Sequence, residues 1–557
     1  MGKVTGGELV VRTLRKAGVK NVFGLHGAHL ESIFQACLDH HIPITDTRHE
    51  VAAGHAAEGY ARATRTLGVA MVTAGPGFTN VITSIANAYL DRTPVLYITG
   101  SSGLGDAETN TLQSGLDQVA VATPITKWAH RITVTQQIPR LVAQAIRMAT
   151  SGPMGPVLLD IPADVLGAQI DEESAPIPER VLLDSPAVPQ VPAIDEAIHL
   201  LKSAARPVIM VGVGAYFSDA GEELRAFAET AGIPVFSDFQ AHGLLPSNHA
   251  LYGGTYHKMA DLSAAGQRPD LVLALGVRFG LFTLGMSDLV VPLAAKIIHV
   301  EIDPKEIGRL RQVAVGIVAD PRETLRALNA RAKSEKWPDR SSWQLTVRNA
   351  KVERCKRAQA DLNRAAPPIH PFQAVSAIAD HIAEDTIVVG DGAEAYHWMN
   401  EVIRQNHPGS YITHGFLGSV GFGLGLSLGA QVAHPKRPVL CLVGDGAVGF
   451  TIAEFDTMVR HKLPIVVVVM NNHSWAASQH FQEIVSGKER LSGTELRDAN
   501  YHEVAAAFGC HAQRVTEIKD LGPAIQAAFA SGKPACINVS IDLAPLPPEL
   551  HLLMARH

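Results

Sequence analysis

Asp445 and Asn472 are the two residues of this sequence whose type and spacing point most directly to chemistry. Asp445 is the centre of a Gly-Asp-Gly tripeptide (444–446), and 24 residues separate that tripeptide from Asn471-Asn472. Each motif follows a strongly apolar run, and parallel strands joined by a helix end at the same edge of their sheet, so we expect Asp445 and Asn472 to meet in space. Carboxylate and amide oxygens suit Mg²⁺, which completes its octahedron with phosphate oxygens and water. The pattern predicts a site for a metal-bound diphosphate.

Simpler interpretations exist for each piece of this pattern. Gly-Asp-Gly by itself is typical of a turn and Asn-Asn of the start of a loop, but the combined spacing favours a cofactor site. The flanking glycines allow backbone N–H groups to approach a diphosphate. No phosphate-binding G-x-x-x-x-G-K-[ST] pattern occurs in the sequence. Gly212 and Gly214 begin a dinucleotide pattern, but Phe217 stands where the third glycine belongs, which predicts a structural turn.

A second carboxyl, Glu50, lies where a strand is expected to give way to a helix. Val-Ala-Ala-Gly follows it, and the tripeptide Gly75-Pro76-Gly77 comes after the next expected strand. An apolar environment allows a carboxyl group to share a proton with a partner group. The alternative is an ordinary carboxylate that interacts with the positive end of a helix.

The elements that position these residues are short runs rich in Val, Ile and Leu, which alternate with segments of helical period. Runs without polar alternation are typical of strands buried on both faces, so the sequence predicts an α/β fold with doubly wound parallel sheets. The expected strands lie within residues 68–73, 93–100, 155–162, 207–214, 269–276, 296–303, 385–392, 437–446, 464–472 and 534–542.

Two breaks in this alternation divide the 557 residues into three domains. One is the Pro-rich, acidic stretch 170–195, and the other is a charged, helix-like segment that ends in Ala-Ala-Pro-Pro before Ile369. The predicted domains are 1–180, 190–340 and 365–545, with a C-terminal tail over 546–557.

Composition excludes several classes of function. With 46% hydrophobic and 18% charged residues the chain is expected to fold, and its net charge of -6 without a basic cluster predicts no nucleic-acid partner and no anionic-membrane partner. Small molecules are the expected partners. Five scattered cysteines, no Cys-x-x-Cys pair, no signal-like N-terminus and no apolar run approaching about 20 residues predict a cytoplasmic protein that does not span a membrane.

Taken together, the Gly-Asp-Gly and Asn-Asn motifs, Glu50 and Gly75-Pro76-Gly77 resemble the thiamin-diphosphate-dependent enzymes, and the resemblance extends over essentially the whole chain. It implies thiamin diphosphate and Mg²⁺ as cofactors, held by a pyrimidine-binding first domain and a diphosphate-binding third domain around a middle domain. It also implies a site between two subunits, with Glu50 from one chain and Asp445 from the other. A homodimer is then the minimum and a homotetramer the expected form.

The same resemblance assigns further cofactor contacts. The carbonyl of Ser474 would join Asp445 and Asn472 around the metal, Gly418 would meet the aminopyrimidine, and Val420 would support the bent cofactor. The remaining contacts implied in this way are Gly392, Ala393, Ser419, Gly444, Gly446 and Ala447.

Within the family, segments such as ETNTLQ, ITKWAHR and YHEVAAAFG resemble the benzaldehyde lyases. This implies cleavage of (R)-2-hydroxy ketones such as benzoin to aldehydes, and the reverse carboligation. His29 would transfer the hydroxyl proton, Gln113 would bind a substrate oxygen or a water, and Tyr396 would present a hydroxyl to the substrate. Outside this context His29 is as typical of an ordinary helix-start or core histidine, and Gln113 is more typical of a surface polar residue.

The sequence departs from that pattern at Ala163, where benzaldehyde lyases carry a tryptophan that lines the substrate channel, so we expect a roomier pocket. Further pocket residues by resemblance are Ala28, His29, Trp398, Ala477 and Phe481.

Rival activities on the same fold are those of acetolactate synthase, the 2-oxoacid decarboxylases and the 2-hydroxyacyl-CoA lyases. The Arg-Phe-Asp-Asp-Arg run of acetolactate synthase appears here as Arg278-Phe279-Gly280-Leu281-Phe282, so FAD is not expected. A non-catalytic cofactor-binding protein is the remaining alternative, and it is disfavoured because the whole set of Glu50, His29, Asp445 and Asn472 is present.

Overall fold

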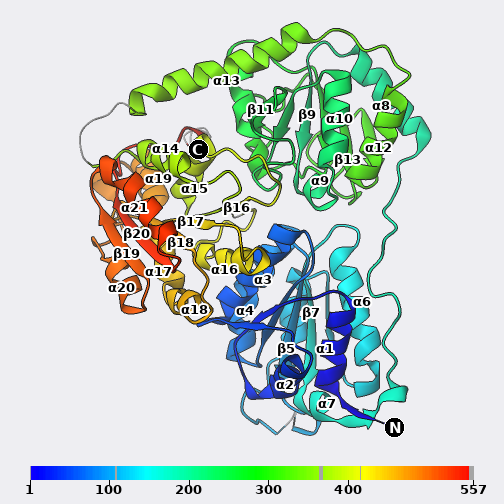
Figure 1. Ribbon diagram of the computed structural model, residues 1–557. Helices are drawn as coiled ribbons and strands as arrows, with labels where there is room; N and C mark the ends of the chain where they lie inside the picture. Colours follow the sequence, from blue (N-terminus) through cyan, green and yellow to red (C-terminus); the bar gives the residue numbers. More distant parts are fainter. Residues whose placement is uncertain (1, 107–108, 363–367, 414, 551–557) are drawn as a thin grey trace.

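Three parallel sheets of six strands, each with helices on both faces, form the core of the protein (Figure 1). The computed structural model describes residues 2–106, 109–362, 368–413 and 415–550, so the end of the predicted C-terminal tail, 551–557, lies outside the described residues. All neighbouring strands within the three sheets are parallel, which confirms the predicted α/β fold of three doubly wound domains.

Strand order in each sheet reverses near its centre, as in other doubly wound folds. The first sheet has the order β3-β2-β4-β5-β7-β6, the second β11-β10-β9-β12-β13-β14 and the third β16-β15-β17-β18-β20-β19. The strands of the first are β2 (Val22–Gly24), β3 (Ile44–Asp46), β4 (Gly68–Val72), β5 (Val95–Ser101), β6 (Trp128–Arg131) and β7 (Val157–Pro162). Those of the second are β9 (Pro207–Val211), β10 (Val235–Ser237), β11 (Tyr252–Thr255), β12 (Leu271–Leu275), β13 (Lys296–Glu301) and β14 (Val315–Val318). Those of the third are β15 (Ile387–Asp391), β16 (Tyr411–Thr413), β17 (Val439–Gly444), β18 (Val466–Asn471), β19 (His511–Val515) and β20 (Ala535–Ser540).

The α-helices follow the strands in each domain. The first domain holds α1 (Gly6–Lys16), α2 (Glu31–Asp39), α3 (Glu50–Thr64), α4 (Pro76–Leu90), α5 (Gln118–Ala122), α6 (Ile138–Thr150) and α7 (Ala163–Gly167). The second holds α8 (Val191–Ser203), α9 (Val213–Phe217), α10 (Gly221–Ala231), α11 (Met259–Ala264) and α12 (Pro321–Ala332), and α13 (Ser341–Leu362) leads out of it. The third holds α14 (Pro371–His381), α15 (Ala393–Val402), α16 (Gly423–Ala433), α17 (Asp445–Thr451), α18 (Glu454–Arg460), α19 (Ala476–Ser486), α20 (Tyr501–Ala507) and α21 (Ile518–Ala530). A short antiparallel pair, β1 (Lys3–Thr5) and β8 (Gln169–Asp171), closes the first domain.

Helices α3 and α16 pack together between the first and third domains, which lie side by side in Figure 1. Beside them, the guanidinium of Arg62 lies between the carboxylates of Glu58 and Asp91, and all three side chains are buried. Arg62 also donates to the carbonyl of Thr413 in the third domain. A buried ion cluster and a helix pair therefore fix the first domain against the third.

The turn at Gly212 and Gly214 is structural, as the sequence predicts. Gly214 N donates to Gly276 O at 3.0 Å, and a Cβ on Gly214 would lie 2.8 Å from Gly276 Cα. The glycines thus allow two turns of the middle domain to touch.

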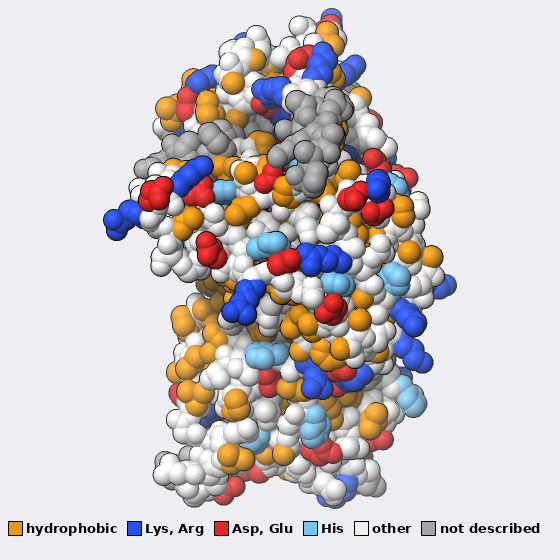
Figure 2. Space-filling model, turned by 90° about the vertical axis from the view of Figure 1, so that its left-hand side faces the viewer, with side chains coloured by type: hydrophobic (Ala, Val, Ile, Leu, Met, Phe, Trp, Pro, Cys, Tyr) orange, Lys and Arg blue, Asp and Glu red, His pale blue; other side chains and the backbone are white. Residues whose placement is uncertain are grey.

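The surface carries mixed charge. Figure 2 shows one face on which Lys and Arg side chains are interspersed with Asp and Glu, without a continuous basic area. Among the described helices, none has both the length and the apolar character needed to cross a bilayer. All five cysteines are free thiols.

Candidate active site

The carboxyl ends of β17 and β18 bring Asp445 and Asn472 to one cavity. The two strands are neighbours, with Gly444 paired to Met470, so the residues that follow each strand leave the sheet together. Both side chains line a cavity of about 280 Å³ in the third domain. The meeting of these two residues, which the sequence predicts, is therefore present in the structure.

The polar atoms of this cavity fit a divalent cation. Asp445 Oδ2 accepts a hydrogen bond from Ser474 N at 3.2 Å, and burial raises the pKa of the Asp445 carboxyl to about 6. Asn472 Oδ1 is buried and has no hydrogen-bond partner. An orphaned amide oxygen is costly unless a ligand satisfies it, and a cation would also stabilise the ionised carboxyl.

The donor set also indicates which metal. Among the described residues there is no group of three or more His, Cys, Asp and Glu side chains arranged for a metal. A carboxylate, an amide oxygen and a backbone carbonyl are hard oxygen ligands, which suit Mg²⁺ rather than zinc.

Glycines keep the cavity floor open to backbone contacts. Gly392 has φ +88° and a Cβ there would lie 3.1 Å from Gly444 N, while a Cβ on Gly446 would lie 2.6 Å from the Trp475 ring. Larger residues would thus fill the space or strain the backbone. The predicted residues that line the cavity with Asp445 and Asn472 are Gly392, Ala393, Trp398, Gly418, Val420, Gly444, Gly446, Ala447, Ser474 and Ala477.

The first domain gathers a second set of predicted residues, around Glu50. Glu50 is the first residue of α3 and is buried, and its Oε2 accepts from Asn80 Nδ2 at 2.9 Å. A Cβ on Gly77 would lie 3.6 Å from Glu50 Oε1 and 2.9 Å from the methyl group of Thr73. Gly77 therefore leaves an open space between the carboxyl and Thr73.

His29 joins the same group through Thr73. Its Nδ1 lies 3.0 Å from Thr73 Oγ1, and burial lowers the pKa of the imidazole, which is therefore neutral at neutral pH. The side chain of Gln113 lies against Gly75, whose φ is +61° and whose missing Cβ would be 3.2 Å away. Gly75 N in turn donates to Gln118 Oε1 at 3.1 Å. The neutral imidazole of His29, the amide of Gln113 and the carboxyl of Glu50 thus all lie next to the segment 73–77.

Gln113 also lines a second cavity, of about 260 Å³, which reaches Pro162. Ala163 follows directly as the first residue of α7 and is half-buried, and Ala28 is exposed beside His29.

The described lining of the third-domain cavity comes entirely from residues 392–541, so Glu50 is not part of it within one chain.

Three of the predicted positions are absent from the described lining of the cavity that holds Asp445. Tyr396 is 4% exposed and its ring packs against Phe239 of the middle domain, with centroids 5.7 Å apart. Phe481 is 43% exposed on α19 and lies outside the described lining. Ser419 Oγ donates to Asn87 Oδ1 of the first domain at 3.2 Å instead of lining the cavity.

Sequence reasoning missed Glu394, a carboxylate in the cavity wall. Glu394 is 8% exposed, its Oε1 lies 2.6 Å from His480 Nδ1, and burial raises the pKa of its carboxyl. The only indication in the sequence was that Glu394 directly follows the predicted cofactor contacts Gly392 and Ala393. Thr73, Asn80 and Gln118 were missed as well, and for these a polar residue near a glycine-rich turn was the sole indication.

Comparison with protein-family models agrees with this geometry. Residues 4–121 match the N-terminal TPP binding domain of thiamine pyrophosphate enzymes, 194–328 the central domain and 391–539 the C-terminal TPP binding domain. The chain belongs to the thiamine pyrophosphate enzyme family. Membership supports thiamin diphosphate as the cofactor, and the matched segments place one TPP binding domain around Glu50 and the other around Asp445.

Curated members of the family align over almost the entire chain. The acetolactate synthase large subunit of Corynebacterium glutamicum is 34% identical and covers 94% of this chain and 85% of its own length. The probable acetolactate synthase large subunit of Methanocaldococcus jannaschii is 31% identical and covers 97% of this chain and 92% of its own length. The acetolactate synthase isozyme 2 large subunit of Escherichia coli is 31% identical and covers 97% of this chain and 96% of its own length. These relatives support the acetolactate synthase alternative better than the benzaldehyde lyase resemblance, which they do not confirm.

Proposed function

We propose that this thiamine pyrophosphate enzyme is a Mg²⁺-dependent carboligase that makes or breaks the carbon–carbon bond of a 2-hydroxy ketone. The observation that carries the proposal is the convergence of Asp445 with the unpartnered Asn472 oxygen on one cavity. When bound, thiamin diphosphate supplies a carbon nucleophile and an electron sink for bonds next to a carbonyl group.

The residues of this chain have distinct roles in the proposal. Asp445, Asn472 and the Ser474 carbonyl hold the metal, and Glu50 shares a proton with the pyrimidine ring. His29 is the base for the substrate hydroxyl, which its lowered pKa and its contact with Thr73 support. Because Glu50 lies outside the described lining around Asp445, each complete site draws its halves from two subunits, as in the family, and the protein works as a homodimer or homotetramer.

Two donor substrates fit this chemistry. The named relatives favour a 2-oxoacid such as pyruvate, as for an acetolactate synthase. An uncharged 2-hydroxy ketone such as benzoin is the second candidate, since the described linings of the two cavities contain a single Lys or Arg, Arg131. Arg131 is already paired with Asp160 at 2.8 Å, which leaves no free cation there to bind a carboxylate. Ala163 gives room for an aromatic substrate.

Incubation of the protein, loaded with thiamin diphosphate and Mg²⁺, with pyruvate, benzoylformate and benzoin in turn tests the proposal. Acetolactate from pyruvate identifies the first candidate, and benzaldehyde from benzoin identifies the second. Carbon dioxide with free aldehyde and no ligation product would indicate a 2-oxoacid decarboxylase and overturn the carboligase assignment. Turnover of none of the three, with the cofactor bound, would do the same.

We further propose that the enzyme works without FAD. Near Arg278, aromatic rings of the middle and third domains pack together: Phe282 lies 5.3 Å from Phe239 and 5.0 Å from Phe416 between ring centroids. The visible absorbance of the purified protein checks this, and a bound flavin spectrum would contradict it.

A further inference from the structure

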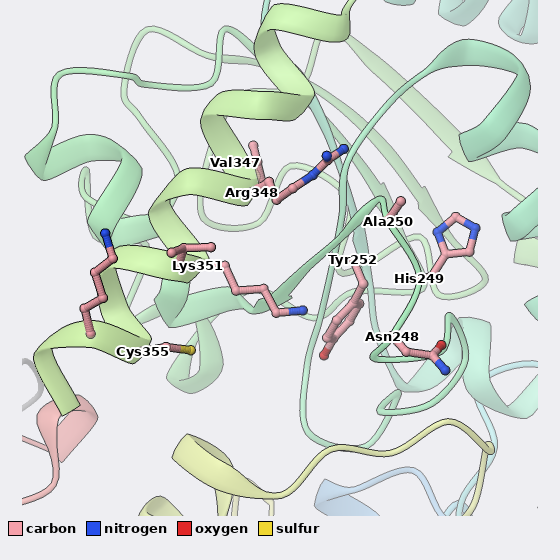
Figure 3. Close-up of a pocket in the computed structure, with 10 residues that line it drawn as sticks. Asn248, His249, Ala250, Tyr252, Val347, Arg348, Lys351 and Cys355 are labelled. Atoms are coloured by element: carbon pink, nitrogen blue, oxygen red, sulfur yellow. The ribbon is translucent and has the colours of Figure 1, made fainter. Parts of the chain in front are cut away.

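A groove unrelated to the cofactor site lies between α13 and the loop that leads into β11. Its volume is about 660 Å³, and it shares no lining residue with the cavity that holds Asp445. Arg348 and Lys351 of α13 both line the groove; in Figure 3 the side chain of Lys351 extends toward Tyr252 on the opposite wall, whereas that of Arg348 points in another direction. The groove is therefore a separate place on the middle domain.

Two of its cations have no carboxylate partner among the described residues. Lys351 Nζ donates to the carbonyl of Ser247 at 3.2 Å, and burial lowers its pKa, with a smaller contribution from nearby Arg404. Arg348 has no ion pair in the described part of the chain. By contrast, the other basic residues of the lining are compensated: Lys356 pairs with a carboxylate at 2.7 Å and His249 with another at 3.0 Å.

The rest of the lining is apolar. Val347 is 7% exposed and belongs to the core of the middle domain, and Tyr252 is 5% exposed with its ring 5.7 Å from Lys351 Nζ. On the rim Val352 is 47% exposed. Apolar walls with a few polar groups at fixed places are typical of small-molecule sites, and uncompensated cations select an anionic group.

We propose that this groove binds a small organic anion: a carboxylate, sulfonate or phosphate group held by Lys351 and Arg348, on an aromatic or aliphatic body that packs on Tyr252, Val347 and Val352. The proposal does not depend on the reaction that the enzyme catalyses.

The test uses the full-length protein saturated with thiamin diphosphate and Mg²⁺, so that the cofactor cavity is occupied. The probe is 8-anilinonaphthalene-1-sulfonate, an aromatic anion whose fluorescence rises when it leaves water. We expect saturable binding that weakens about tenfold or more in the double variant Arg348→Gln/Lys351→Gln, because charge-assisted hydrogen bonds are lost. Lys351→Arg retains binding. Arg357→Gln, on the same helix but outside the lining, serves as the matched control.

Three outcomes would overturn the proposal. Unchanged binding in the double variant, with its circular dichroism and thermal midpoint as in the wild type, would show that the cations do not hold the anion. Equal affinity for the uncharged N-phenyl-1-naphthylamine would show an apolar surface only. Loss of probe binding as the protein concentration and oligomer size rise would show an interface between copies of this chain.

Discussion

The neighbouring residues Asn471 and Asn472 allow a direct test of the metal site, because the structure gives them opposite environments. Asn471 Nδ2 donates to Asn538 Oδ1 at 3.1 Å, and Asn471 Oδ1 accepts from His473 N at 3.3 Å. Asn472 Oδ1 is buried without a partner. Leucine has nearly the shape of asparagine without its polar atoms, so the same substitution at the two positions separates structure from ligand binding.

The magnitudes follow from these bonds. Asn471→Leu leaves buried partners unsatisfied and is expected to lower the free energy of unfolding by about 1–3 kcal/mol. Asn472→Leu removes an orphaned acceptor, so the cofactor-free protein is expected to be as stable as the wild type or more stable, by up to about 1–3 kcal/mol. The cost appears on binding: loss of one metal ligand is expected to weaken the affinity for Mg²⁺ and thiamin diphosphate about tenfold or more.

Urea unfolding with and without thiamin diphosphate and Mg²⁺ measures both effects. Ligand that binds only the folded state stabilises it in proportion to its affinity, so Asn472→Leu should lose most of the cofactor-induced shift that Asn471→Leu keeps. If Asn472→Leu retained the wild-type shift, or if both variants lost stability equally without cofactor, the assignment of Asn472 as the metal ligand would be refuted.

Three further predictions concern buried charges. Because burial lowers the pKa of His29, the neutral imidazole persists at a lower pH than in a free histidine, and the acid limb of the kcat/KM profile should lie below about pH 6.5. The variant His29→Ala should lower kcat/KM about a hundredfold or more and abolish that limb. Arg62→Met leaves Asp91 buried without its cation, so urea unfolding should show a loss of about 3–5 kcal/mol; a loss below about 1 kcal/mol would contradict this. Burial disfavours the charged form of His480, but the hydrogen bond to Glu394 outweighs this effect and raises the pKa of His480. The variant Glu394→Gln should therefore make His480 titrate at lower pH, as measured by NMR with labelled histidine. An unchanged titration midpoint would contradict the pairing.

The central strands of all three sheets could be predicted from the sequence, whereas several outer strands could not. Every residue of β18 is buried, since helices cover both faces, and such strands are continuous apolar runs. Edge strands such as β6, with the sequence Trp-Ala-His-Arg, and β19 are only partly buried and carry polar residues. Their place is set by pairing with β7 and β20, which local composition does not encode.

Side-chain direction within the site was beyond the sequence for a related reason. Tyr396 and Trp398 are two positions apart on α15, which separates them by about 200° around the helix, so only one of them can face the cavity. Tyr396 packs against the ring of Phe239 in the middle domain, whereas Trp398 lines the cavity that holds Asp445. No pattern within α15 distinguishes these two aromatic residues.

The sequence by itself determined the parallel α/β architecture and the placing of Asp445 and Asn472 at neighbouring strand ends, because strand burial and strand direction follow from local hydrophobicity and chain order. Only the tertiary structure decided which asparagine is hydrogen-bonded and which has a side-chain oxygen without a partner. The reason is physical: hydrogen-bond satisfaction and access to a cavity depend on atoms supplied by elements far apart in the chain.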